Sequence, residues 1–138
     1  MDKKELVAAL RNLNLPLDQF IVVGGGVLTV HGIRETEDID IVVTPDLFTI
    51  LRQSWTLKTR PNGKPGLHKG CVEAYLDVNC ETFEKTTEWL LFHSDIVEGI
   101  HFIDLKTLAG FKAGYGREKD ISDLKLIVQY IGNLNIGF

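Results

Sequence analysis

The chain has 138 residues, of which 44% are hydrophobic and 25% are charged, and its formal net charge is −4. This length fits one domain over residues 1–138, and the near-average composition excludes disordered, collagen-like and coiled-coil proteins. The acidic balance argues against a general nucleic-acid coat protein, and no apolar run approaches the length of a membrane helix. Two cysteines and an N-terminus without a signal-peptide pattern favour a reduced, cytoplasmic setting.

The first half of the chain alternates predicted helices with short strands. Apolar residues at helical spacing follow Asp2 and Glu5, which have the spacing of a capping box. Runs rich in β-branched residues predict the strands. The predicted elements are a helix over 2–13, a strand over 20–23, a helix over 27–31, a strand over 38–43 and a helix over 46–52.

The second half is predicted to add further strands and two C-terminal helices. Strands over 55–60 and 70–78 are expected to pair antiparallel across a loop at 61–66. The other predicted elements are helices over 86–92, 104–115 and 120–131 and a strand over 99–103. Asp120 is expected to cap the final helix. The expected core stripe of that helix is Ile121, Leu124, Val128 and Ile131. This order indicates an α/β (α+β) fold with a small mixed sheet flanked by helices.

Asp38 and Asp40 open the clearest strand of the sequence. Residues two apart in a strand point to the same face, so these carboxylates project together, roughly 6–7 Å apart. Like charges at this distance repel unless a cation lies between them, and hard oxygen ligands suit Mg²⁺. The alternative is a pair of solvated acids at the end of a polar turn.

Three consecutive glycines, Gly24, Gly25 and Gly26, lie between a predicted strand and a predicted helix. Bare backbone N–H groups at a helix N-terminus favour an anion, and glycine lets a phosphate approach closely. This pattern predicts a phosphate seat at Gly24 and Gly25, with Gly26 as a spacer. The alternative is a tight turn that needs positive φ. A P-loop is excluded because Val27 and Leu28 follow the glycines in place of the Lys-Ser/Thr pair that it needs. A Rossmann turn is excluded because this sequence has Thr29 at the position of the last glycine in the GxGxxG pattern.

The segment 22–43, with its Gly-Gly pair, helix and Asp-hydrophobic-Asp strand, resembles the signature of the polymerase-β-type nucleotidyltransferase superfamily. It is most similar to the small bacterial branch of antibiotic nucleotidyltransferases and toxin-like proteins of the AbiEii group. The resemblance implies that the chain transfers a nucleoside monophosphate from an NTP to an acceptor hydroxyl with Mg²⁺ or Mn²⁺, releasing pyrophosphate. It also implies a third carboxylate on a neighbouring strand. Asp77 is the best match in the sequence, and Glu73, on the same strand face, is its competitor.

The resemblance extends to three candidate nucleotide-binding cations. Lys112 lies on the apolar stripe of a predicted helix, where it either extends to the rim or reaches a triphosphate. Arg117 contacts phosphate or pairs with Glu118 or Asp120. Arg34, between the glycines and the acids, aids nucleotide binding or pairs with Glu35 or Glu37.

The alternative function is a catalytically inactive member of the same fold that binds a nucleotide or a partner protein. A chain this short leaves little material for an acceptor site, so a homodimer or a toxin–antitoxin-like complex is expected. Nucleic acid is a less favoured partner, supported only by a basic rim of Lys58, Arg60, Lys64 and Lys69. The four histidines lack the spacing of zinc ligands and are predicted to be structural or exposed.

Overall fold

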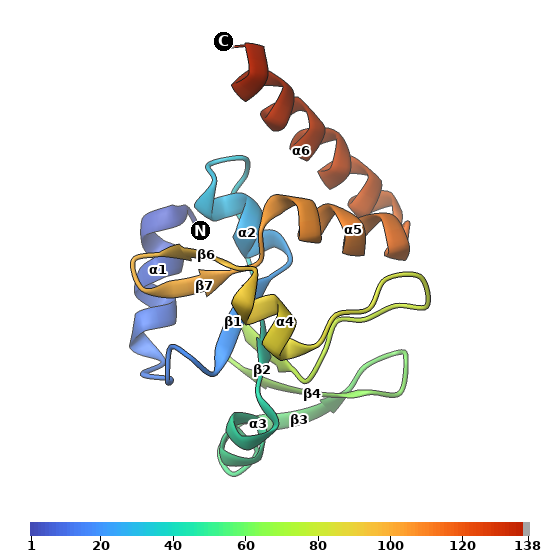
Figure 1. The fold of residues 1–138 in the computed structure, drawn as a ribbon. Helices are drawn as coiled ribbons and strands as arrows, with labels where there is room; N and C mark the ends of the chain where they lie inside the picture. Colours follow the sequence, from blue (N-terminus) through green and yellow to red (C-terminus); the bar gives the residue numbers. More distant parts are fainter. Residues whose placement is uncertain (137–138) are drawn as a thin grey trace.

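The computed structural model describes residues 1–136, and its centre is one mixed β-sheet (Figure 1). The described strands are β1 (Phe20–Val23), β2 (Ile39–Val43), β3 (Thr56–Thr59), β4 (Pro65–Lys69), β5 (Val72–Tyr75), β6 (Asp95–Val97) and β7 (Ile100–Phe102). Their order in the sheet is β3-β4-β5-β2-β1-β7-β6. The β2–β5 and β1–β7 pairs are parallel, and the other neighbouring pairs are antiparallel. The chain is therefore a mixed α/β protein, as the order of predicted elements indicated.

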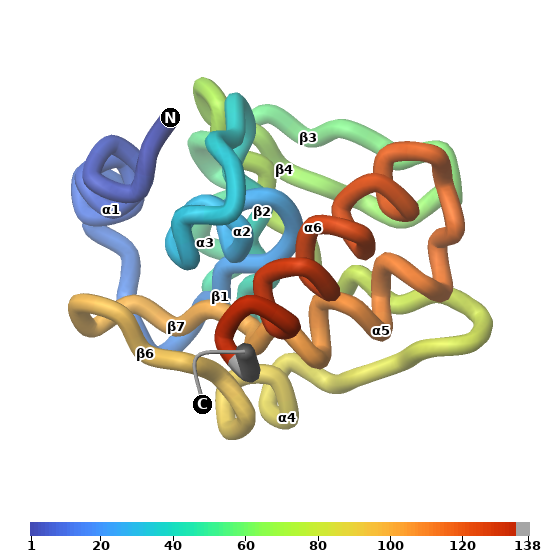
Figure 2. The backbone as a smooth tube through the Cα atoms, turned by 90° about the horizontal axis from the view of Figure 1, so that it is seen from above, coloured from blue at the N-terminus to red at the C-terminus, as the bar shows by residue number. Residues whose placement is uncertain are grey.

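Six helices accompany the sheet in the described part of the chain. They are α1 (Lys3–Asn12), α2 (Gly25–Val30), α3 (Pro45–Leu51), α4 (Thr87–Phe92), α5 (Leu105–Tyr115) and α6 (Glu118–Ile136). Helix α2 contacts β1 and β2, α5 contacts α2, and α6 packs against α5. Figures 1 and 2 show α6 running over α5 and leading away from the sheet. None of the described helices is long and apolar enough to cross a membrane.

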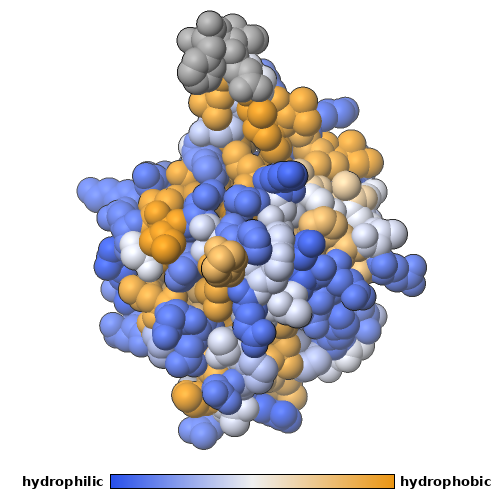
Figure 3. All heavy atoms as spheres, viewed as in Figure 1, coloured by the Kyte–Doolittle hydropathy of each residue, from blue (hydrophilic) through white to orange (hydrophobic). Residues whose placement is uncertain are grey.

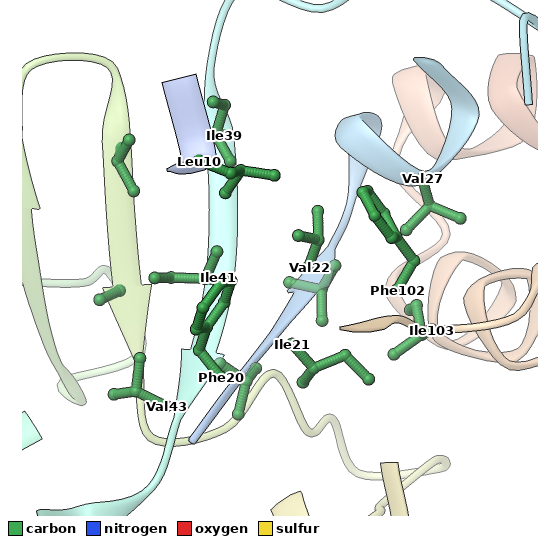
Figure 4. Close-up of a cluster of buried hydrophobic side chains, with 14 of the residues drawn as sticks. Leu10, Phe20, Ile21, Val22, Val27, Ile39, Ile41, Val43, Phe102 and Ile103 are labelled. Atoms are coloured by element: carbon green, nitrogen blue, oxygen red, sulfur yellow. The ribbon is translucent and has the colours of Figure 1, made fainter. Parts of the chain in front are cut away.

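The hydrophobic core gathers around the two central strands. All four residues of β1 are buried, and Ile39 and Ile41 of β2 are fully inaccessible to solvent (Figure 4). Gly26 also belongs to this core, because a Cβ at this position would stand only 2.9 Å from Cγ1 of Val22. The prediction that Gly26 is a spacer is therefore wrong: the glycine permits close packing of α2 on β1.

Local sequence signals set most element boundaries. The capping box of α1 is present, with Asp2 accepting a hydrogen bond from the Glu5 amide and Glu5 accepting one from the Asp2 amide. The side chains of Thr44, Thr86 and Asp104 cap the next three helices after α2, each accepting one hydrogen bond from a backbone amide of the first turn. These boundaries agree with the predicted helices to within one or two residues at their starts.

The region between β3 and β5 differs from the prediction. Residues 65–69 form the strand β4, which lies between the two strands that were expected to pair directly. Pro65 and Gly66 suggested a loop, but proline is tolerated at the first residue of a strand. The turns lie on either side, at Gly63 and Gly70, both of which have positive φ. A second short strand, β6, was also missed, and it joins β7 through a turn at Glu98 and Gly99.

The inward face of α6 is also different from the prediction. Ile121, Val128 and Ile131 are exposed by 47%, 68% and 40%, whereas Leu124 is half-buried and Ile127, outside the predicted stripe, is buried. Asp120 and Asp123 are buried on the inward side because basic residues of α5 and of the loop before β2 pair with them. Three of the four residues of the predicted stripe therefore face outward, and Figure 3 shows apolar residues gathered over this upper part of the molecule.

Candidate functional site

A pocket of about 1080 Å³ lies where the central strands meet the two C-terminal helices. One side is formed by β2, β4 and β5, and the other by α5 and the start of α6. In Figure 1, β2 and β4 lie below α5 and α6. The glycine turn between β1 and α2 closes the end between them. All the candidate site residues named from the sequence, except Asp77, line this pocket.

The first side, the strand wall, carries the carboxylates of Asp38, Asp40 and Glu73. Asp40 on β2 and Glu73 on β5 are register partners in a parallel pair, so their side chains leave the sheet side by side on one face. Asp38 is exposed and comes just before β2. Among the described residues, no lysine or arginine forms an ion pair with any of the three. The strand wall is therefore a group of acids without a cationic partner.

The electrostatics of Asp40 reflect this arrangement. Burial, and then the charges of Glu73 and Asp38, raise the pKa of the Asp40 carboxyl from 3.8 to about 6. The charges of Lys119 and Lys112 oppose the increase without cancelling it. A buried carboxylate near two others has a strong affinity for a proton or a metal cation.

The glycine turn lies directly against Asp40. Gly24 has φ +66° and ψ −145°, and a Cβ at this position would stand 3.0 Å from Oδ2 of Asp40. A Cβ at Gly25 would stand 2.9 Å from the hydroxyl of Thr36 and 3.3 Å from Nη2 of Arg34. A side chain at either position would therefore require these neighbours to shift, and the positive φ of Gly24 in addition favours glycine there.

The second side, the helix wall, carries basic residues that are already paired. Nζ of Lys112 lies 2.8 Å from Asp123 and 3.4 Å from Asp120, and all three side chains are at least nine-tenths buried. Arg117 donates to Asp120 from Nε at 2.6 Å, and Arg34 forms a two-bond fork with Asp123 at 2.9 Å per bond. Three cations and two carboxylates thus form one continuous network.

This network controls the ionisation of its two aspartates. Burial acts to raise the pKa of Asp120, but the hydrogen bond from Arg117 and the charges of Arg117 and Lys112 outweigh it and hold the pKa below its ordinary value. The pKa of Asp123 is lowered in the same way by Arg34 and Lys112, against the opposing effect of burial. Both aspartates therefore stay ionised at neutral pH and keep the three cations in place.

This network shows which ion pairs the three cations form and leaves their contact with phosphate as a prediction. The pairing of Arg117 with Asp120 is confirmed, whereas Arg34 pairs with Asp123 and not with Glu35 or Glu37. Lys112 does not extend to an exposed rim. Asp120 lies inside α6 and accepts from the Arg117 amide, so its prediction as the residue before the helix is wrong.

Asp77 lies outside the pocket. It follows the end of β5, where its carboxylate accepts hydrogen bonds from Nζ of Lys64 at 2.9 Å and from the Asn79 amide at 3.1 Å. The structure therefore places Glu73, and not Asp77, beside Asp38 and Asp40. Both acids have the same strand parity, so alternation did not distinguish them; the β2–β5 register does.

Three pocket residues were missed by sequence reasoning. Tyr75 donates a hydrogen bond to Glu73, Asp123 anchors the helix wall, and His68 is the register partner of Glu73 on β4. Reading 65–69 as a strand with alternating polarity would have placed His68 on the Glu73 face. The sequence held no comparable signal for Asp123, because its role depends on the packing of α6 against α5.

The acids of the strand wall are the residues that suit a metal ion. Among the described residues, no three acidic, histidine or cysteine side chains converge as a ready-made metal site. Mg²⁺ is usually bound through one or two carboxylates together with substrate phosphates. The donor set of Asp38, Asp40 and Glu73 therefore fits a cation that arrives with an anionic substrate.

Comparison of the chain with family models, with curated proteins and with solved structures found no significant match.

Proposed function

We propose that the chain is a metal-dependent nucleotidyltransferase with a nucleotidyltransferase fold. The observation that carries this proposal is the Asp40–Glu73 register pair, with Asp38 two residues before Asp40 and Gly24 against its carboxylate. A strand-to-helix glycine turn next to unpaired acids suits a triphosphate that is bound together with a divalent cation.

The strand wall and the turn have separate tasks in this proposal. Asp38 and Asp40 would hold Mg²⁺ or Mn²⁺, and Glu73 replaces Asp77 as the third carboxylate. The cation, when bound, neutralises charge on the phosphates and stabilises the entering and leaving oxygens. The acceptor oxygen would bond to the α-phosphorus, the bond from the α-phosphorus to the bridging oxygen of the β-phosphate would break, pyrophosphate would leave, and the acceptor proton would pass to water.

The helix wall is proposed to hold the phosphates indirectly. Its three cations carry one more charge than its two carboxylates, so an attractive field of about one unit charge remains. Lys58 and Lys119, both exposed at the pocket, are further candidates for contact with the triphosphate. Arg34, Lys112 and Arg117 would then position the turn and α6 in addition to attracting the substrate.

Substitution of the strand-wall acids tests this function. Asp38→Ala and Asp40→Ala are each expected to lower Mg²⁺-dependent transfer by about 10²–10³-fold, because charge stabilisation by a bound metal contributes several kcal/mol. Pyrophosphate release from each NTP with candidate acceptors is the measurement, and Asp18→Ala, on the exposed loop before β1, is the matched control. Unchanged release in both pocket variants would exclude the proposed function.

The pairing of the helix wall favours a second candidate, an inactive member of the same fold that binds a nucleotide or a partner protein. Arg34, Lys112 and Arg117 already have carboxylate partners, which reduces the charge available for catalysis. Calorimetry with each NTP and Mg²⁺ separates the candidates. Binding without pyrophosphate release, across the acceptors tested, favours the inactive protein. A homodimer or a partner protein that completes the acceptor site stays a prediction, tested by the mass of the chain in solution.

A further inference from the structure

Tyr75 lies in the pocket beside the carboxylates of the strand wall. It is two residues after Glu73 on β5, so both side chains leave the same face of the strand. The Tyr75 hydroxyl donates a hydrogen bond to Oε2 of Glu73. A phenolic hydroxyl has one proton to donate, and here that proton is directed at the Glu73 carboxylate.

Two neighbours fix the position of the tyrosine ring. Gly66 is its register partner on β4, and a Cβ there would stand 2.9 Å from Cε1 of the ring. The guanidinium of Arg60 lies 4.4 Å from the ring centroid and donates to the Asp77 carbonyl at 3.1 Å. Close backbone approach and a cation–π contact thus hold the ring next to Glu73.

The hydrogen bond occupies only one of the two Glu73 oxygens. No described residue donates to Oε1, which leaves that atom available on the side of the sheet shared with Asp40. Glutamate has a longer and more flexible side chain than aspartate, so fixing one oxygen reduces the freedom of the other. Carboxylates that bind metals are commonly oriented by hydrogen bonds of this kind.

We infer that Tyr75 is a positioning residue that holds Glu73 for a divalent cation shared with Asp38 and Asp40. This inference rests on the proposed function, because it requires the strand wall to bind a cation. Gly66 and Arg60 act one step further away by holding the ring. In this inference Tyr75 acts through Glu73 and is not itself a ligand of the cation.

Binding of Mn²⁺ alone, followed by electron paramagnetic resonance, tests the inference without an assay of activity. Tyr75→Phe is expected to weaken Mn²⁺ binding by about 10–100-fold, the usual effect of removing a hydrogen bond to a metal ligand. Tyr115→Phe is the matched control: Tyr115 lines the same pocket beneath Arg117, but its hydroxyl donates to the Val78 carbonyl. It is expected to bind Mn²⁺ as the native chain does.

A double substitution shows whether Tyr75 acts through Glu73. In a Glu73→Gln chain, Tyr75→Phe is expected to cause no further weakening. Gly66→Ala retains the hydroxyl but displaces the ring, and it is expected to weaken Mn²⁺ binding as Tyr75→Phe does.

The outcomes separate this inference from the proposed function. Native affinity in Tyr75→Phe, or equal weakening with and without Glu73, overturns the role of Tyr75 and leaves a metal site on Asp38 and Asp40. Absence of Mn²⁺ binding by the native chain overturns the inference, and the proposed function is then decided separately by the pyrophosphate-release assay, in which the cation arrives with the NTP.

Discussion

The two walls of the pocket differ in how their charges are neutralised: within the described part of the chain, the buried aspartates of the helix wall are paired with basic residues, and the carboxylates of the strand wall are not. In the helix wall, each buried aspartate is paired with two basic side chains. In the strand wall, three carboxylates lie together, and no described residue forms an ion pair with them. Fully paired charges are typical of a network that fixes packing, whereas clustered charges without partners are typical of a binding site. The comparison therefore assigns a structural task to the helix wall and a chemical task to the strand wall.

Removal of Lys112 tests the structural role of the helix wall and is expected to have the largest effect on stability. Lys112→Met is expected to lower the free energy of unfolding by about 3–4 kcal/mol, because two buried aspartates lose a partner. The effect lies at the lower end of the range for buried pairs, since Asp120 keeps Arg117 and Asp123 keeps Arg34. Urea denaturation at neutral pH measures it. The triple substitution of Lys112, Asp120 and Asp123 by apolar residues is the control, and it is expected to recover most of the loss.

A loss below 1 kcal/mol in Lys112→Met would contradict the structural role of the helix wall. The cation would then be free to contact substrate, and the two walls would differ less than their pairing indicates.

Replacement of Asp40 in the strand wall is expected to raise the free energy of unfolding, whereas replacement of Lys112 in the helix wall lowers it. The native carboxyl has a pKa of about 6, against 3.8 for its ordinary value, so the folded chain binds the proton more tightly than the unfolded chain. Stability is therefore lost as the pH rises from about 4 through 6. Asp40→Asn removes this loss and is expected to stabilise the chain by up to about 3 kcal/mol above pH 7, and by little at pH 4.

Urea denaturation of Asp40→Asn and the native chain across pH 4–8 measures this difference. Added Mg²⁺ is expected to stabilise the native chain and not the variant, because a bound cation favours the folded state. A stability difference that does not change with pH would show that the Asp40 carboxyl is not raised in pKa by its neighbours.

Sequence patterns predicted much of the fold because the central strands and the first helix are encoded by local signals, such as β-branched runs and capping residues. The β-branched run before the glycines forms β1, Asp38 lies just before β2 and Asp40 is its second residue, and the capping box of α1 is present. Strand order was less accessible, because Pro65 and Gly66 resemble a turn while their backbone is paired on both sides. Only long-range pairing distinguishes the two interpretations.

The candidate site was predicted only in part, because some of its residues belong to a local motif and the others are brought together by long-range pairing. Gly24 and Asp40 were named from a local motif, and they lie in contact distance of one another. The choice between Glu73 and Asp77 depended on the β2–β5 register, which two acids of equal strand parity do not reveal. The inward face of α6 depended on ion pairs between Lys112 and two aspartates, which hydrophobic periodicity does not register.

Gly24 lies against Asp40 of the strand wall, and its substitution is expected to have an intermediate effect. Gly24→Ala is expected to destabilise the chain by about 2–3 kcal/mol, because φ +66° with ψ −145° is a glycine conformation and the new Cβ would meet Asp40. Gly32→Ala is the matched control, with φ +72° and no atom within 4 Å of the new Cβ. It is expected to lose about 1 kcal/mol. Equal losses of stability in the two variants would show that contact with Asp40 does not add to the cost of Gly24→Ala.

The ion pair between Lys64 and Asp77 gives the smallest expected effect and decides the third carboxylate. Its side chains are exposed by 43% and 31%, so Lys64→Ala is expected to lower the free energy of unfolding by less than about 1 kcal/mol. Asp77→Asn is expected to have a similarly small effect and to leave Mn²⁺ affinity unchanged, whereas Glu73→Gln lowers that affinity. Calorimetric titration of both variants with Mn²⁺ makes the comparison. The reverse result, with Asp77→Asn weakening the site and Glu73→Gln sparing it, would mean that Asp77 leaves Lys64 to join Asp38 and Asp40 when a cation binds.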